Sequence, residues 1–357
     1  MNDLTKIPCM LFRGGTSKGV CLLADDLPAD DQKRNQLILR IMGSPDHRQI
    51  DGIGGGSFTT SKVAIISKST KEGADVDYKF LQVGTDKAII DDKPTCGNVL
   101  TAVGVFALEN NLVVIKEGTT KVRIFDINTK SKITQVIQTP NKVIQYQGDF
   151  SIAGVPGSAS AIDMSFDNIA GGKTGHYLPT SNVIDVFNGI HATCVDVSMP
   201  TVFIKAQDLG CTGLEDVNEL DSNKALIESL DSIRELASQK MGLGNSKGSV
   251  IPKIALISKP NVNGADINIR YFTPLSCHPA IAVSASFCLS VGCFIEGTLM
   301  HQMTKCKLSP NQNHEVSIQN PSGVTKVTIN FPDDDIFHVK AYIKRTARII
   351  FSGSIYA

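Results

Sequence analysis

Thr95-Cys96-Gly97-Asn98, followed by Val99-Leu100-Thr101-Ala102-Val103-Gly104-Val105-Phe106-Ala107-Leu108-Glu109-Asn110, is the stretch that decides the fold. It predicts a helix over 99–110 that is apolar on nearly every face, since no polar stripe recurs with a period of 3.6 residues. Such a helix belongs inside the protein. The N–H groups at a helix start attract anions and favour a thiolate there. The stretch therefore indicates a central helix that begins with either a reactive or a structural cysteine.

A second stretch repeats this pattern nearer the C-terminus. Ser276-Cys277-His278-Pro279 leads into an apolar run over 280–295. We expect this run to form a second buried helix with Cys277 at its start, because proline suits a first turn, where its missing N–H is not needed. Two cysteines at the starts of two buried helices favour a chemical role over packing alone.

The composition excludes several classes of function. Of 357 residues, 42% are hydrophobic, and 35 Lys and Arg balance 35 Asp and Glu. This balance, with no Trp and few aromatic residues, predicts no nucleic-acid partner. No run of ~18 apolar residues occurs, so we expect no membrane association. The length suits about two domains of ~150 residues each.

The N-terminus and the cysteines indicate the compartment. No apolar run follows Met1–Lys6, so we expect no signal peptide and a cytoplasmic protein. The nine cysteines are scattered and odd in number, which predicts reduced thiols in that compartment. None forms Cys-x-x-Cys and no two histidines have ligand spacing, so the sequence predicts no metal site.

Two glycine-rich stretches precede apolar strands. They are Arg13-Gly14-Gly15-Thr16-Ser17-Lys18-Gly19 and Asp51-Gly52-Ile53-Gly54-Gly55-Gly56-Ser57. The first is not a P-loop, because its lysine precedes the last glycine and a strand follows where a helix would be needed. It is typical either of a hairpin turn or of a loop whose backbone N–H groups bind an anion.

Lys62 lies where the second glycine-rich stretch enters the strand Ser61-Lys62-Val63-Ala64-Ile65-Ile66-Ser67. Loss of water at that position would lower the pKa of the amine toward neutrality and make it a usable base. A surface lysine, whose stem covers apolar atoms while its ammonium reaches water, gives the same pattern. The local sequence leaves both interpretations open.

An internal repeat relates the two halves of the chain. Ser61–Lys68 matches Pro252–Lys259, and Gly73–Asp77 matches Gly264–Asn268, both at an offset of 191 residues. We interpret this repeat as a duplication that gives two α/β domains, each with short strands around one buried helix.

The domain boundary is expected at 180–189, which gives domains over 1–185 and 186–357. Amphipathic helices are expected over 30–42 and 221–240.

In such a duplicated fold, the starts of the two buried helices, with their cysteines, can face each other across a cleft. A pocket there, lined by thiols, N–H groups and cations such as Arg270, would suit a small polycarboxylate.

Longer motifs make the sequence resemble a known family. Cys96-Gly97-Asn98, paired with a second helix-starting cysteine, resembles the diaminopimelate epimerase fold group. Further runs resemble the branch of 2-methylaconitate isomerase and 4-oxalomesaconate tautomerase, with the tautomerase nearer. They cover essentially the whole chain and are Met10–Gly19, Met42–Asp46, Gln49–Gly55, Thr60–Ser67, Ala74–Tyr78, Gly154–Gly157, Ile269–Phe272, Ser276–His278 and Arg345–Arg348.

The resemblance implies an α/β fold of two pseudo-symmetric domains, with strands wrapped around a buried central helix in each and the active site in the cleft between them. It leaves the C-terminal strand free to pack on the first domain. It also implies a carbon-acid reaction without cofactor or metal. The implied partner is a small di- or tricarboxylate substrate, and the resemblance is compatible with a homodimer.

The same resemblance assigns residues. The family's catalytic lysine falls on Lys62 and its catalytic cysteine on Cys96. His278-Pro279 departs from the amino-acid epimerases, in which Gly and Ser or Thr follow the second cysteine, and this argues against racemisation by two thiols. The residues expected to bind the substrate are Arg13, Thr16, Ser17, Gly55, Gly97, Asn98, Arg270, Ser276, Cys277 and His278.

These residues predict an isomerase or tautomerase that moves a proton and a double bond in an unsaturated keto-tricarboxylate such as 4-oxalomesaconate. Lys62 would remove a proton, and the N–H groups of Gly97 and Asn98 would stabilise the dienolate. Cys96 would deliver a proton at another atom. The alternatives are cis–trans isomerisation of 2-methylaconitate and a protein of the same fold that binds carboxylates without turnover.

Overall fold

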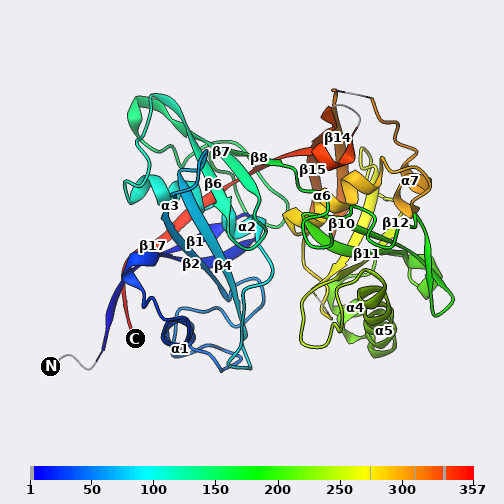
Figure 1. Ribbon diagram of the computed structural model, residues 1–357, viewed down its shortest axis with the longest axis horizontal. Coiled ribbons are helices and arrows are strands. Elements are labelled where there is room, and N and C mark those ends of the chain that lie inside the picture. Colours follow the sequence, from blue (N-terminus) through cyan, green and yellow to red (C-terminus); the bar gives the residue numbers. More distant parts are fainter. Residues whose placement is uncertain (1–3, 274, 310, 333–334) are drawn as a thin grey trace. The chain divides into compact units, whose positions relative to one another are not determined.

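The computed structural model describes residues 4–273, 275–309, 311–332 and 335–357 (Figure 1). The chain divides into two compact units. Unit 1 comprises Met1–Ser165 and Lys344–Ala357, and unit 2 comprises Phe166–Ile343. The limits of the units fall within two strands, β8 (Ile162–Asp167) and β16 (Lys340–Arg345).

Unit 1 contains a sheet in which the two ends of the chain pair. β1 forms an antiparallel hairpin with β2 and pairs on its other edge with β17, which returns from the C-terminus (blue and red in Figure 1). β2 pairs parallel with β3, β3 antiparallel with β4, and β4 parallel with β6 of the β6–β7 hairpin. These strands are β1 (Lys6–Gly14), β2 (Ser17–Leu23), β3 (Lys62–Lys68), β4 (Val76–Val83), β5 (Ile90–Asp91), β6 (Gly118–Asp126), β7 (Lys132–Thr139) and β17 (Ala347–Tyr356).

The helix expected over 30–42 is confirmed as α1 (Asp31–Met42). Asp30 caps it, because its side chain accepts a hydrogen bond from the N–H of Lys33 at 2.8 Å. Gly43 ends the helix in a left-handed conformation, with φ of 75°. The apolar face of α1 packs on a core formed with β1, β2 and β3, to which it contributes Ile38, Ile41 and Met42.

The apolar stretch predicted as one helix over 99–110 is buried but divided. It forms α2 (Gly97–Leu100) and α3 (Val103–Glu109), which are separated by Thr101 and Ala102. All four residues of α2 and six of the seven in α3 are buried. The expectation of a buried segment with Cys96 at its start is confirmed, since Cys96 is the residue immediately before α2. The expectation of one continuous helix is wrong.

Gln135, on β7, explains this division. Its Nε2 donates to the carbonyl of Leu100 at 2.7 Å, and its Oε1 accepts from the N–H of Gly104 at 2.9 Å. In a continuous α-helix these two backbone groups would bond to each other. The amide therefore replaces one helical hydrogen bond and satisfies both groups, which is a recognised cause of a helix kink. A Cβ at Gly104 would lie 2.3 Å from Gln135 Oε1, so the position requires glycine.

Unit 2 has the same order of strands. β10 and β11 are antiparallel, β11 pairs parallel with β12, β12 antiparallel with β13, and β13 parallel with β14 of the β14–β15 hairpin. The register also repeats, because Ile66 faces Tyr78 in unit 1 and Ile257 faces Ile269 in unit 2, each 191 residues later. The strands are β9 (Asp185–Phe187), β10 (Ile190–Val197), β11 (Met199–Lys205), β12 (Lys253–Ser258), β13 (Ile267–Phe272), β14 (Asn313–Asn320) and β15 (Gly323–Asn330).

Two consecutive helices of unit 2, α4 (Val217–Ser222) and α5 (Lys224–Lys240), lie side by side (Figure 1). The helix expected over 221–240 is confirmed over Lys224–Lys240 as α5, whereas residues 221 and 222 belong to α4. Asn223 separates the two helices and caps α5, because its side chain accepts from the N–H of Leu226 at 3.1 Å. The apolar face of α5 packs on β10, β11 and β12 through Leu226, Leu230, Ile233 and Ala237.

The central helix of unit 2 is α6 (Val283–Gly292), and α7 (Leu299–Thr304) follows it. All ten residues of α6 are buried, so the prediction that the apolar run after Pro279 contains a buried helix is confirmed. The expectation that Cys277 begins this helix is wrong. The residue before the first turn is Ala282.

Two interactions explain why Cys277 lies outside α6. Cys277 forms an isolated antiparallel bridge with Phe272, and the N–H of His278 donates to the carbonyl of Tyr271 at 2.7 Å. Both interactions hold the chain in an extended conformation beside the end of β13. His278 also precedes a proline, which disfavours the helical conformation. The helix therefore starts only after this extended segment.

Candidate active site

Lys62 is the first residue of β3, and it is buried, with 4% of its surface exposed. Its amine donates to Oε1 of Gln82, on the neighbouring strand β4, at 2.6 Å. The ring centroids of Phe58 and Phe80 lie 4.3 and 5.2 Å from the amine. The interpretation of Lys62 as a surface lysine is therefore wrong, because the amine lies among aromatic rings and away from water.

Burial lowers the pKa of Lys62 below its ordinary value, because the water that would stabilise the ammonium is removed. The Cys96 side chain acts in the opposite direction, through its charge and through a hydrogen bond to the amine. The Lys62 amine and the Cys96 thiol are thus direct neighbours. They form a pair in which one group can accept a proton and the other can donate one.

The residues around Cys96 fix its position. Its carbonyl accepts from the N–H of Leu100 at 2.8 Å and from the hydroxyl of Tyr78 at 3.3 Å. Thr95, the preceding residue, donates through its hydroxyl to the carboxylate of Asp126. Burial raises the pKa of Asp126, against hydrogen bonds from Thr95, Asn128 and Thr129 that lower it. Asp126 therefore anchors the chain at the start of α2.

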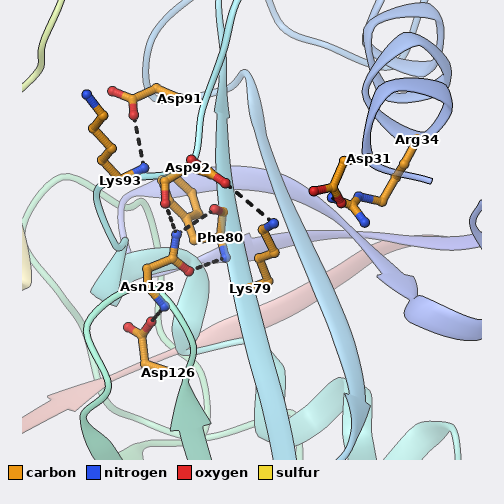
Figure 2. A network of polar contacts seen from close by, with 9 residues as sticks. All are labelled: Asp31, Arg34, Lys79, Phe80, Asp91, Asp92, Lys93, Asp126 and Asn128. Carbon is orange, nitrogen blue, oxygen red and sulfur yellow. Dashed lines mark hydrogen bonds and ion pairs between the residues drawn. The ribbon is translucent and has the colours of Figure 1, made fainter. Parts of the chain in front are cut away.

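The turn between β6 and β7 supports the same site from a second direction, and Figure 2 shows the contacts of its residue Asn128. The side chain of Asn128 donates to the carbonyls of Phe80 at 2.9 Å and Asp92 at 2.6 Å, and accepts from the N–H of Phe80 at 2.8 Å. The N–H of Asn128 donates to Asp126 at 2.8 Å. One turn therefore holds Phe80, whose ring lies near the Lys62 amine, and also Thr95, which precedes Cys96.

Asn98, in α2, is buried against the turn between β1 and β2. Its Nδ2 donates to Oγ1 of Thr16 at 3.1 Å, while its Oδ1 is buried and makes no hydrogen bond within the described residues. Gly15 has φ of +51°, and a Cβ there would lie 2.2 Å from Asn98 Oδ1. Gly14 faces Ser17 across this turn, so the hairpin interpretation of the first glycine-rich stretch is confirmed.

Arg13 is tied to the segment before β17. Its Nη1 donates to the carbonyl and the hydroxyl of Thr346, at 2.6 and 2.9 Å, and to the carbonyl of Gly15 at 3.2 Å. Arg348 faces it across the β1–β17 pair. Burial and the like charge of Arg348 lower the pKa of Arg13. Ser17, at the other end of the turn, is buried.

The second glycine-rich stretch is organised by Gln49, which the sequence indicated only as part of the run Gln49–Gly55 and without a role. Gln49 is 1% exposed; its Nε2 donates to Oγ of Ser61 at 2.7 Å and its Oε1 accepts from the N–H of Gly56 at 2.9 Å. The N–H of Gly55 donates to the carbonyl of Thr60 at 3.2 Å. These bonds fix Ser61, the residue immediately before Lys62.

In unit 2, Arg270 lines a cavity of about 410 Å³ together with Glu215 and Pro279. Its Nε donates to the carbonyl of Glu215 at 2.7 Å, and its Nη1 donates to Oδ1 of Asn268 at 2.9 Å and to the carbonyl of Ile269 at 3.1 Å. Burial lowers its pKa, while the charges of Cys277 and Glu215 oppose that shift. The guanidinium is thus held in a fixed orientation beside the cavity.

Ser276 and Cys277 are held by Asp221, on α4. The hydroxyl of Ser276 donates to one carboxylate oxygen at 2.7 Å, and the N–H of Cys277 donates to the other at 2.6 Å. Burial, with the charge of Asp221, raises the pKa of Cys277 to about 12. The Cys277 thiol therefore stays protonated near neutral pH. His278 accepts through Nδ1 from the N–H of Ala280 at 3.0 Å.

The two cysteines share a local sequence pattern, but their side chains have different neighbours in the structure. Cys96 contacts a buried lysine amine, whereas Cys277 lies beside a carboxylate and a guanidinium.

In the part of the chain that the structure describes, no group of three or more His, Cys, Asp or Glu side chains is arranged to hold a metal ion. None of the described helices is long and apolar enough to cross a membrane.

Relatives define the class of protein to which this site belongs. The putative isomerase YbhH of Escherichia coli (strain K12) is 45% identical over 354 residues, which covers 99% of each chain. The 4-oxalomesaconate tautomerase of Pseudomonas putida is 42% identical over 351 residues, which covers 98% of this chain and 96% of that one. The protein described here is an isomerase.

The family model described as PrpF protein matches residues 4–357, and the chain belongs to this family. A crystal structure of methylitaconate-delta-isomerase is 35% identical and has a TM-score of 0.80, with 100% of this chain and 96% of that chain covered. The resemblance stated from the sequence motifs is therefore confirmed. The mixed α/β fold of the chain is similar to that of this solved relative.

Proposed function

We propose that the protein moves a proton and a double bond in an unsaturated keto-tricarboxylate such as 4-oxalomesaconate. The observation that carries the proposal is the contact between Cys96 and the Lys62 amine, whose pKa burial lowers. A buried amine is neutral at lower pH than a lysine in water, so a larger fraction of it is available to accept a proton from a carbon acid. The 42% identical tautomerase supports this choice of substrate.

In the first step, Lys62 removes a proton from the carbon α, or vinylogous, to the keto and carboxylate groups. The electron pair of that C–H bond spreads into a dienolate, and the amine becomes an ammonium. The N–H groups of Gly97 and Asn98 begin α2 and have no partner within it, which supports their role as donors to the developing oxyanion.

In the second step, Cys96 gives a proton to another carbon of the dienolate, and the double bond moves. The thiolate that remains then receives the proton that Lys62 has taken up, through the hydrogen bond between the two side chains. The resting amine and thiol are restored. The proton balance closes with these two side chains, so we expect activity to persist after dialysis against a chelator.

The other residues expected at the site take binding roles in this proposal. In unit 1 they are Arg13, Thr16, Ser17, Gly55 and Asn98, of which Thr16 and Asn98 bond to each other. In unit 2 they are Arg270, Ser276, Cys277 and His278. Within the described residues, Nη2 of Arg270 makes no hydrogen bond, which supports a role in binding a carboxylate in its cavity.

The common strand order and register of the two units support our proposal that they arose by duplication.

We also propose a homodimer. β17 pairs on one edge with β1, and Ile350, Phe351 and Tyr356 on this strand are 49%, 42% and 53% exposed. Exposed apolar residues on one strand favour association. Light scattering on the purified protein would test this proposal.

An absorbance and proton NMR assay with a panel of unsaturated acids tests the function. We expect turnover of 4-oxalomesaconate, with exchange of solvent deuterium into the substrate. The alternative, cis–trans isomerisation of 2-methylaconitate, can use the same pair of side chains, so both acids belong in the panel. The proposal would be contradicted if neither acid is turned over. Binding of an acid without turnover would show a protein that binds carboxylates and does not catalyse the proton transfers.

A further inference from the structure

We propose that Gln82 is a positioning residue, whose side-chain carbonyl orients the Lys62 amine for proton abstraction. The inference rests on the proposed role of Lys62 as the base. Gln82 lies in no sequence motif considered above, and its position follows only from the pairing of β3 with β4. In that pairing Lys62 and Gln82 face each other directly.

The contact between the two side chains is short and buried. Lys62 Nζ lies 2.6 Å from Gln82 Oε1, and the two residues are 4% and 6% exposed. In such surroundings a hydrogen bond is stronger than in water, because little solvent competes for either group. The amine therefore has a preferred direction for one of its N–H bonds.

The amide of Gln82 is itself fixed. Its Nε2 donates to the carbonyl of Ser61 at 2.9 Å and to the carbonyl of Phe58 at 3.2 Å. An amide nitrogen can only donate and an amide oxygen can only accept, so the two carbonyls require Oε1 to face the lysine. Gln82 thus connects the backbone of Phe58 and Ser61, which precede Lys62 in the chain, to the Lys62 amine.

The remaining neighbours of the amine restrict it further. The rings of Phe58 and Phe80 lie 4.3 and 5.2 Å from Nζ, and Cys96 forms a hydrogen bond with it. A neutral amine has two N–H bonds and one lone pair. With one N–H directed to Gln82 and rings and thiol nearby, rotation of the amine is restricted, and the direction of its lone pair is restricted with it.

The choice of glutamine over glutamate has a chemical reason. An uncharged amide accepts a hydrogen bond from either form of the amine and so orients it without a full negative charge. A carboxylate at the same place would stabilise the ammonium and reduce the amount of base at neutral pH. An apolar side chain would favour the neutral amine and increase the amount of base, but it would leave the amine without a hydrogen bond that orients it.

Two variants at this one position test the inference, with the pH dependence of kcat/KM as the readout. Activity that requires a neutral amine rises with pH through the pKa of Lys62. For Gln82→Glu we expect this rise to move upward by at least about one pH unit, with a rate at least about tenfold lower at pH 7. For Gln82→Met we expect the rise to move downward, with a lower kcat and a nearly unchanged KM.

Gln319→Glu is the matched control. Gln319 is 7% exposed, lies in unit 2, and uses Oε1 to accept from the N–H groups of Asn261 and Val262. We expect its pH profile to match that of the wild type. The position of a pH profile does not depend on how much of a variant folds, so reduced yield of either Gln82 variant leaves the test valid.

Profiles of both Gln82 variants that coincide with the wild type, or that move in the same direction, would overturn the inference. That result is distinguishable from failure of the proposed function. If Lys62 is not the base, Lys62→Met keeps exchange of solvent deuterium, whatever the Gln82 variants do. Loss of exchange in Lys62→Met together with unshifted Gln82 profiles rejects only the role of Gln82.

Discussion

Gln135 Oε1 lies 2.9 Å from the N–H of Gly104, in the place that a backbone carbonyl would take in an unbroken helix. The other end of the same amide binds the carbonyl of Leu100 at 2.7 Å. A side chain from β7 therefore divides the buried stretch that carries Cys96 at its start. Gly104 and Gln135 depend on each other, because any Cβ at position 104 would collide with the amide.

This dependence predicts a strong coupling between substitutions at the two positions. Gly104→Ala should destabilise the protein by about 1–3 kcal/mol through overpacking. Gln135→Ala should cost about 1–3 kcal/mol for each backbone group left unpaired. In the double variant the alanine Cβ at position 104 no longer collides with the Gln135 amide, so the cost should be well below the sum. Urea unfolding of the three variants measures this, and additive costs would contradict the explanation of the break.

A second prediction concerns the stability of Lys62→Met. The pKa of Lys62 is lowered from 10.5 in the folded protein, so below 10.5 the unfolded chain binds a proton that the folded one does not. The wild type therefore loses stability as pH falls from 10.5 toward the folded pKa, and Lys62→Met does not. We expect Lys62→Met to melt at a higher temperature than the wild type at pH 7, with the difference narrowing as pH approaches 10.5.

Lys68→Met, at the exposed end of the same strand, is the control for that prediction. It should melt within a degree or two of the wild type, because exposed substitutions change stability by less than about 0.5 kcal/mol. Thermal melts followed by circular dichroism at several pH values give the comparison. Two results would contradict the lowering of the Lys62 pKa by burial. One is a Lys62→Met variant that is less stable than the wild type at pH 7. The other is a difference in melting temperature that is the same at all pH values.

A third prediction separates Cys277 from Cys96. The pKa of Cys277 is raised to about 12, so its thiol is protonated in the working range and a hydroxyl can replace it. Cys277→Ser should keep exchange and turnover within a few-fold of the wild type. Asp221→Ala should instead destabilise the protein by about 1–3 kcal/mol, since the N–H of Cys277 loses its acceptor. Steady-state rates and melting curves distinguish these effects, and loss of exchange in Cys277→Ser would refute the assignment.

Local signals in the sequence predicted a large part of this structure. The amphipathic pattern over 30–42 predicted α1, and the apolar runs after Cys96 and Pro279 contain buried helices. The repeat at an offset of 191 residues appears in the structure as a repeated register of strand pairs. These features depend on neighbours in the chain or on simple periodicity, which a single sequence displays.

Features that depend on contacts between distant segments could not be predicted. Gln82 faces Lys62 only because β3 and β4 pair in one register, and Gln135 reaches α2 and α3 from another hairpin. Cys277 resembled Cys96 in its local pattern, but Asp221 and Tyr271 hold it in an extended segment. The burial of Gln49 could not be predicted from the run Gln49–Gly55, since a glutamine in a glycine-rich loop is ordinarily exposed.

The central claim is that Lys62 removes the substrate proton and Cys96 returns one elsewhere. Proton NMR of solvent-deuterium exchange into 4-oxalomesaconate, on folded Lys62→Met and Cys96→Ser, tests it most directly. We predict that Lys62→Met loses both exchange and turnover, and that Cys96→Ser keeps exchange while turnover falls by at least about 100-fold, in line with loss of a positioned acid. Exchange at near wild-type rate in Lys62→Met would contradict the account, because the base would then lie elsewhere.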